Sequence, residues 1–187
     1  KGGDLWRLSQ PRVNGLGMPY LQVNRNKKSL CLNLKEPEAR EIFYKLVRGA
    51  DVVVEQYRPG VAARLGIDYD TVSRLNPRLV YCSISGFGQD GPYRLRSGHD
   101  LNYISCAGIL GLTAWKGCKP AIPSVQIGDV GGGALYAMSG ILIALMGAKA
   151  TGRGQYVDTA MFDGAISLMG WNASGYFATG EDVEPES

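Results

Sequence analysis

The sequence contains a single histidine, His99, and two acidic residues that could share its chemistry. Asp100 follows it directly, and Asp129 comes thirty residues after His99, shortly before the glycines 131–133. An imidazole and a carboxylate of different resting protonation are suited to removing a proton from carbon and returning it. A lone histidine is more often a surface or satisfied core residue, so the spacing alone leaves that structural interpretation open.

Glycines beside these residues would let a ligand approach the backbone. We expect Asp100 to be the N-cap of a helix over 100–110, and Asp129 to precede a long apolar helix over 132–148. Free amides at a helix start favour negative charge, so we predict that amides near Asp129 or Gly131 stabilise a developing oxyanion. The structural alternative is a cap at Asp129 and glycines that permit close packing between a helix and the sheet.

A second group of candidate residues is basic, and its alternative interpretation is a solvated surface. Its members are Arg25, Lys27, Lys28, Lys35, Arg58, Arg64, Arg94 and Arg96. Arg58 and Arg64 follow a predicted strand, where α/β folds commonly hold ligands, and a phosphorylated ligand would suit them. The net charge of +3 is too small to indicate a nucleic acid, and no aromatic-rich basic platform supports one.

Several enzyme classes lack their motifs in this chain. There is no G-x-x-x-x-G-K-[ST] loop and no G-x-S-x-G elbow. The four cysteines are scattered without a C-x-x-C pair, which favours a reduced, cytoplasmic protein without a metal site. The uncharged stretch 130–148 has the length of a membrane span, but it holds five glycines. We expect a buried helix and no membrane partner.

Hydrophobic patterning predicts one α/β domain over 1–187 with a largely parallel sheet, an irregular lead-in over 1–28 and a flexible acidic tail over 181–187. The loop 86–98 is long and rich in glycine and proline, which is typical of a functional loop. The predicted strands cover 29–34, 51–55, 79–85 and 155–159, and the further predicted helices cover 37–47, 61–65, 69–75 and 162–176.

Ordered short motifs along nearly the whole chain resemble class III coenzyme A-transferases, the carnitine/bile-acid-inducible type, and within them the α-methylacyl-CoA racemase branch. The matching segments are 24–29 (NRNKKS), 33–35 (NLK), 50–55 (ADVVVE), 57–61 (YRPGV), 64–66 (RLG), 86–89 (GFGQ), 98–103 (GHDLNY), 128–129 (GD), 151–155 (TGRGQ) and Asp158. The resemblance implies a Rossmann-like, mostly parallel sheet flanked by helices. It also implies that this chain is the large domain of a longer protein, truncated at both ends.

For the activity, the resemblance implies His99 and Asp129 as the catalytic residues of a 2-methylacyl-CoA racemase, which moves a proton on and off the α-carbon with two bases. The alternative is a class III CoA-transferase with Asp129 as nucleophile. Transferases usually have a different residue, often tyrosine, at the position of His99, so the histidine favours the racemase. A second alternative is an inactive CoA-binding fragment, because the glutamate that pairs with the histidine in racemases would lie beyond residue 187.

The same resemblance implies an acyl-CoA thioester as substrate, no metal, and a homodimer, since family members form interlaced dimers. The residues that it implies for coenzyme A are Leu32, Asn33, Lys35, Arg58, Arg64, Gly98, Asp100 and Tyr103.

Overall fold

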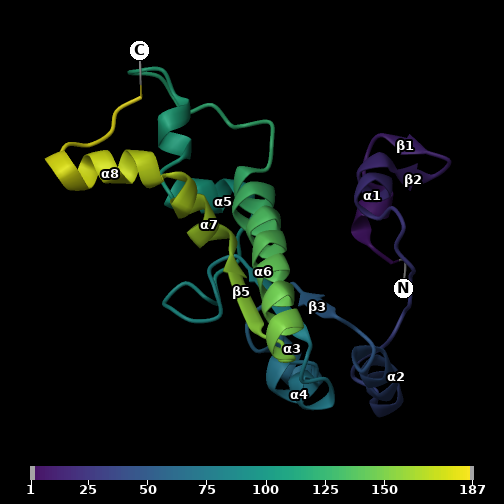
Figure 1. The fold of residues 1–187 in the computed structure, drawn as a ribbon. Helices are drawn as coiled ribbons and strands as arrows, with labels where there is room; N and C mark the ends of the chain where they lie inside the picture. The colour runs from purple at the N-terminus through teal and green to yellow at the C-terminus, as the bar shows by residue number, and fades with distance from the viewer. Residues whose placement is uncertain (1–2, 186–187) are drawn as a thin grey trace. The chain divides into compact units, whose positions relative to one another are not determined.

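The computed structural model describes residues 3–185, and the chain divides into two compact units, Lys1–Asn33 and Leu34–Ser187 (Figure 1). The first unit holds short elements where the sequence predicts an irregular lead-in. They are a 3-10 helix (Leu5–Leu8), the antiparallel pair β1 (Arg12–Val13) and β2 (Leu16–Gly17), and α1 (Met18–Val23). Asn14 and Gly15 join the two strands with φ values of 50° and 81°. That backbone is typical of a two-residue hairpin turn with an Asn-Gly sequence.

The second unit is built on a parallel sheet in the order β3 (Val52–Glu55), β4 (Val80–Ser85) and β5 (Tyr156–Ala160). The predicted α/β class is therefore confirmed, and each of these strands lies within one residue of its predicted bounds. The register places Glu55, Ser83 and Asp158 opposite one another in one row. Polar side chains thus cross the sheet toward its carboxyl edge, where parallel sheets commonly bind ligands.

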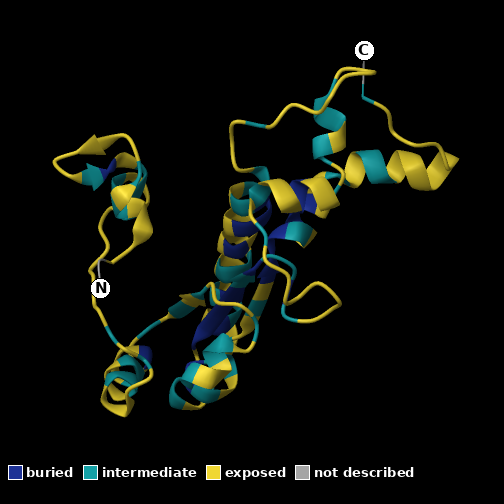
Figure 2. Cartoon of the chain, turned by 180° about the vertical axis from the view of Figure 1, so that it is seen from behind, coloured by how far each residue is buried: buried dark blue, intermediate teal, exposed yellow. Residues whose placement is uncertain are grey.

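Helices cover both faces of this sheet. On one face lie α2 (Pro37–Val47), α3 (Val61–Leu65) and α4 (Tyr69–Leu75), whose predicted bounds are confirmed. The buried cluster there consists of Val47, Val72, Leu79 and Tyr81. On the opposite face the buried cluster joins Val80 of β4 to Ala144 and Ala148 of α6 (Tyr136–Thr151). The buried residues accordingly concentrate around β4, as Figure 2 shows.

The strand predicted over 29–34 is wrong. This segment forms no regular element, and no strand of the described residues pairs with it. Alternating apolar and polar residues are compatible with any extended backbone, and a strand also needs a neighbour that accepts its hydrogen bonds.

The long apolar helix begins earlier than predicted and is less buried than predicted. A π-helix (Ile127–Leu135) leads directly into α6, so helical backbone runs from Ile127 to Thr151. Within residues 3–185 it is the one helix long and apolar enough to cross a membrane, judged by length and composition. Its small residues face the sheet, whereas Ile143 and Met146 are 69% and 73% exposed, so the expectation of a buried helix is wrong.

Two other helices also differ from their predicted bounds. Helix α5 (Asp100–Cys106) stops before Gly108, whose φ of 87° is incompatible with a continuing helix, and a 3-10 turn (Leu110–Thr113) follows. The helix predicted over 162–176 is two helices, α7 (Met161–Leu168) and α8 (Gly170–Thr179). The described part of the acidic tail, through residue 185, contains no helix or strand.

Two glycines hold the π-helix against α7. A Cβ atom at Gly132 would lie 2.5 Å from the carbonyl oxygen of Met161 and 2.7 Å from the backbone nitrogen of Ala165. Gly164 meets the backbone of Gly132 from the opposite side. Because the obstructing atoms belong to backbone, no side-chain rotation can relieve such a clash.

We therefore predict that Gly132→Ala lowers the free energy of unfolding by about 2 kcal/mol, because the two helices must separate. The matched control is Gly175→Ala in α8, where a Cβ would meet no atom within 4 Å. We expect that variant to gain about 0.5–1 kcal/mol, since alanine favours helix over glycine. Urea unfolding of both variants checks this, and equal effects would show that the close approach does not matter.

Candidate active site

His99 and Asp100 lie at the start of α5, where the loop 86–98 from β4 ends. The predicted cap is wrong by one residue: His99 is the N-cap and Asp100 is the first helical residue. The backbone N–H of His99 donates to Oδ1 of Asn102 at 3.0 Å. This is half of a capping box, in which a side chain three residues into the helix reaches back to the cap. The carboxylate of Asp100 is thereby left for another partner.

That partner is the backbone of Asp129. The N–H of Asp129 donates to Oδ1 of Asp100 at 2.9 Å, which joins two segments 29 residues apart. Gly128 permits the approach, because a Cβ there would lie 3.3 Å from the carbonyl oxygen of Asp100 and 3.2 Å from Cβ of Tyr103. The start of the π-helix is therefore fastened to the start of α5.

The amides predicted to stabilise an oxyanion are already engaged. Asp129 lies within the first turn of the π-helix rather than before a helix, and its N–H is bonded to Asp100. The N–H of Gly131 donates to the carbonyl oxygen of Gln126 at 3.4 Å. The Gly131 bond is of the π-helical kind, to the fifth residue back. Because the helical backbone begins at Ile127 and not at Gly132 as predicted, this N–H already has a partner. The N–H groups of Asp129 and Gly131 are therefore not free to bind an oxyanion.

The carboxyl group of Asp129 has a pKa raised above its ordinary value. Partial burial is the largest cause, and the neighbouring charge of Asp100 adds to it. The charge of His99 lowers the pKa, as does a hydrogen bond with the backbone of Asp100. The pair proposed from the sequence is thus brought into one electrostatic environment, with an exposed imidazole and a half-buried acid. Such an acid can exist in both protonation states closer to neutral pH than an ordinary aspartate.

Tyr103 supports this site from within. Its ring is buried, lies against Gly86 and Gly98, and makes an edge contact with Phe87 at 5.2 Å between centroids. Burial raises the pKa of its phenol, and the charge of Asp129 raises it further. A Cβ at Gly98 would lie 2.7 Å from the Tyr103 ring, so this glycine is required for packing. The structure therefore gives Gly98 and Tyr103 a packing role beside the acid.

The other residues expected to bind coenzyme A are dispersed over both units. Leu32 and Asn33 belong to the first unit, half-buried and exposed respectively. Lys35, Arg58 and Arg64 belong to the second unit and have exposed side chains. Arg64 lies in the last turn of α3, after the turn that follows β3. No group of three or more potential metal ligands occurs within residues 3–185.

Two further positioning contacts escaped the sequence analysis. Asn102 accepts the backbone N–H of the N-cap His99, and its position three residues after His99 is a usable signal. Asp158 on β5 accepts a hydrogen bond from the backbone N–H of Gln89 at 3.2 Å, which ties the loop 86–98 to the sheet. Burial raises the pKa of Asp158. No local pattern could identify that contact, because the partners are 69 residues apart.

Comparison with known proteins places the chain in a family. The family described as CoA-transferase family III matches residues 1–187. The chain belongs to CoA-transferase family III. Family members of both kinds of activity are similar to it. The acetyl-CoA:oxalate CoA-transferase of Acetobacter aceti is 38% identical over 179 residues, covering 92% of this chain and 46% of the relative. The human alpha-methylacyl-CoA racemase is 37% identical over 159 residues, covering 84% and 42%.

The fold is also that of solved family members. A CAIB/BAIF family protein from Brucella suis superposes with a TM-score of 0.88 at 34% identity, covering 94% of this chain and 47% of that one. This CoA-transferase family III chain therefore spans about half the length of the relatives that it matches.

The contact between Asp100 and Asp129 leads to a prediction about charge. Asp100→Asn keeps an oxygen that can accept the Asp129 N–H but removes a neighbouring negative charge. We expect the pKa of Asp129 to fall, as measured by carbon-detected NMR titration of the side-chain carboxyl groups. The pKa of Asp158, to which Asp100 does not contribute, should stay constant as an internal control. An unchanged or increased pKa at Asp129 would contradict the arrangement.

Proposed function

We propose that this chain carries the proton-transfer site of an acyl-CoA racemase, inverting the α-carbon of a 2-methylacyl-CoA thioester. The observation that supports this most is the hydrogen bond from the Asp129 backbone N–H to Asp100, the residue that directly follows His99. Inversion needs one group to remove a proton from one face and another to deliver a proton to the opposite face. An imidazole and an acid of raised pKa suit these complementary roles.

In one direction, neutral His99 removes the α-proton and becomes an imidazolium, while the electron pair moves onto the thioester oxygen as an enolate. Protonated Asp129 then delivers its proton to the opposite face of the α-carbon, which restores the thioester. In the reverse direction Asp129 is the base and His99 the acid. The raised pKa of Asp129 supports this assignment, because a larger fraction of the carboxyl is protonated than at an ordinary aspartate.

For coenzyme A we propose the residues taken from the resemblance. Arg58, Arg64 and Lys35 supply positive charge for phosphate groups. Leu32 and Asn33 would contact the nucleotide portion, and Asp100 would lie at the thioester end. Gly98 and Tyr103 would act there mainly by packing, because Tyr103 fills the space beside Gly98.

A class III CoA-transferase is the second candidate, because the similar proteins include transferases as well as racemases. The similar proteins include the transferase of Acetobacter aceti and a succinyl-CoA:glutarate CoA-transferase from human, 33% identical over 175 residues. In this reaction the Asp129 carboxylate attacks the thioester carbonyl, giving a mixed anhydride and CoA thiolate. The thiolate then attacks the aspartyl carbonyl, releasing the first carboxylate and forming an aspartyl-CoA thioester. An acceptor carboxylate reverses these steps and leaves as the new acyl-CoA. His99 has no required part in this sequence of steps.

A second copy of the chain is the proposed protein partner. Helix α6 exposes Leu142, Ile143 and Met146, an apolar surface of the kind that protein contacts cover.

The decisive experiment is hydrogen exchange at the α-carbon. The chain is incubated with a single stereoisomer of a 2-methylacyl-CoA in heavy water, and deuterium incorporation and loss of optical purity are followed by NMR. We expect both to proceed together, and we expect Asp129→Asn and His99→Asn each to slow them by about 100-fold or more, since each removes a general acid–base group. Asparagine at position 99 retains N-cap capacity, which protects the helix start.

Asp182→Asn serves as the control, because this carboxylate lies in the tail after α8 and should leave the rate unchanged. The transferase would replace the racemase if CoA were transferred to a free carboxylate without deuterium incorporation at the α-carbon. That transfer would be lost in Asp129→Asn and retained in His99→Asn. If the chain bound coenzyme A but catalysed neither reaction, the inactive CoA-binding fragment would be the correct alternative.

A further inference from the structure

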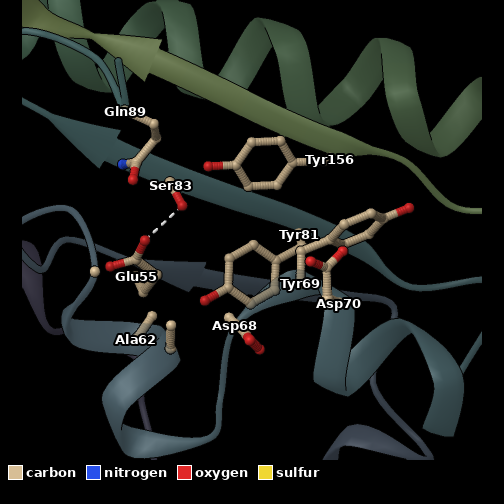
Figure 3. Close-up of a pocket in the computed structure, with 11 residues that line it drawn as sticks. Glu55, Ala62, Asp68, Tyr69, Asp70, Tyr81, Ser83, Gln89 and Tyr156 are labelled. Atoms are coloured by element: carbon tan, nitrogen blue, oxygen red, sulfur yellow. Dashed lines mark hydrogen bonds between the residues drawn. The ribbon is translucent and has the colours of Figure 1, made fainter.

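A separate hollow lies on the face of the sheet that α3 and α4 cover (Figure 3). It encloses about 290 Å³, and its walls include Glu55, Asp68, Asp70, Tyr81, Ser83 and Gln89. None of these residues takes part in the proton-transfer site described above. The volume is close to the lower end of the range found for small-molecule pockets.

The carboxylates of this hollow are held in fixed positions without a cationic partner. Glu55 accepts hydrogen bonds from the hydroxyl of Ser83 and, at 2.6 Å, from the backbone N–H of Tyr57. Asp68 accepts from the backbone N–H and the hydroxyl of Thr71, both at 3.2 Å. Across residues 3–185, no lysine or arginine forms an ion pair with Glu55, Asp68 or Asp70. These carboxylates therefore lack an ion-pair partner among the described residues, so a cationic ligand is favoured beside them.

A buried hydroxyl in the same wall has no hydrogen-bond partner. Tyr81 is 1% exposed, and its hydroxyl oxygen is unpaired among the described residues. Figure 3 shows its ring directed toward the space between Glu55 and Asp68. The side-chain nitrogen of Gln89 is also buried and unpaired. Unpaired buried donors are rare and costly in folded proteins, so each indicates a missing partner.

We propose that this hollow binds a small primary ammonium compound that also carries an oxygen atom a short distance from its amine, as ethanolamine does. The ammonium group donates to the carboxylates of Glu55 and Asp68, and its charge compensates theirs. The oxygen atom accepts a hydrogen bond from Tyr81 or Gln89, which satisfies a buried donor. An organic cation suits the hollow better than a metal ion, because within residues 3–185 no cluster of three potential metal ligands exists.

The phenol of Tyr81 remains a hydrogen-bond donor at neutral pH. Burial raises its pKa, and the charges of Glu55 and Asp68 raise it further, so the hydroxyl stays protonated at neutral pH. The ring itself is packed in the core beside Val72 and Leu79 and stacks on Tyr156 at 5.9 Å between centroids. The hydroxyl position is consequently fixed by packing rather than adjustable.

Ligand-observed NMR titration of the chain with ethanolamine, ethylene glycol and glycolate at constant ionic strength tests the proposal. We expect saturable binding of ethanolamine, weaker binding of the neutral diol and none of the anion. Glu55→Gln should weaken the binding of ethanolamine about tenfold, because a charge-assisted hydrogen bond is lost. Tyr81→Phe should weaken it several-fold and should also raise the melting temperature without ligand, since an unpaired buried hydroxyl is removed.

Asp182→Asn is the charge-matched control and should bind ethanolamine like the unmodified chain. Absence of saturable binding, equal binding of glycolate, or affinity unaffected by both Glu55→Gln and Tyr81→Phe would each overturn the proposal. Because Tyr81→Phe retains the packed ring, it gives a folded variant even if Glu55→Gln does not. Neither racemase nor transferase activity enters the readout, so the result is independent of the function proposed above.

Discussion

The hydrogen bond from the backbone of Asp129 to the carboxylate of Asp100 is the contact on which the candidate site depends. It joins the segment that leaves β4 to the helix that leads back toward β5, so it fixes His99 relative to Asp129. Gly128 permits this close approach to α5, and Gly132 allows the same π-helix to lie against α7. The sheet brings the starts of α5 and of the π-helix near one another, and this hydrogen bond fixes their relative position.

That arrangement has an electrostatic cost. Two carboxylates are brought together in a partly buried place, which raises the pKa of Asp129 above its unfolded value. Linkage gives the consequence: the contribution of this group to stability is complete below the unfolded pKa and declines as the pH rises through the folded pKa. Where Asp129 is ionised, its charge therefore weakens the fold. A site that needs an acid poised for proton exchange commonly carries such a cost.

The sequence predicts the parts of this structure that depend on local patterns. Strands β3 to β5 and helices α2 to α4 follow from β-branched runs, amphipathic spacing and glycine stops, and all were predicted closely. The prediction of a strand over 29–34 fails because alternation of apolar and polar residues cannot show whether a pairing partner exists. The π-helix could not be predicted, because bonding to the fifth residue back has no sequence signature distinct from that of an α-helix.

The contacts of the candidate site could not be predicted from the sequence. His99 and Asp129 stand out by type and by neighbouring glycines, and their catalytic roles stay predictions. Asp100 was predicted as the N-cap of α5, whereas the N-cap is His99, and only geometry shows that Asn102 accepts the His99 amide and Asp100 the Asp129 amide. The unpaired hydroxyl of Tyr81 depends on packing between β4, α3 and α4, which no local pattern encodes.

The most direct test of a shared site is the pKa of Asp129 when His99 is replaced by asparagine, followed by NMR titration of the carboxyl carbon. The charge of His99 lowers that pKa, so its removal should raise the value above that of the unmodified chain. An unchanged pKa at Asp129 would mean that the imidazole and the acid do not face a common space, and the proton-transfer account would then fail.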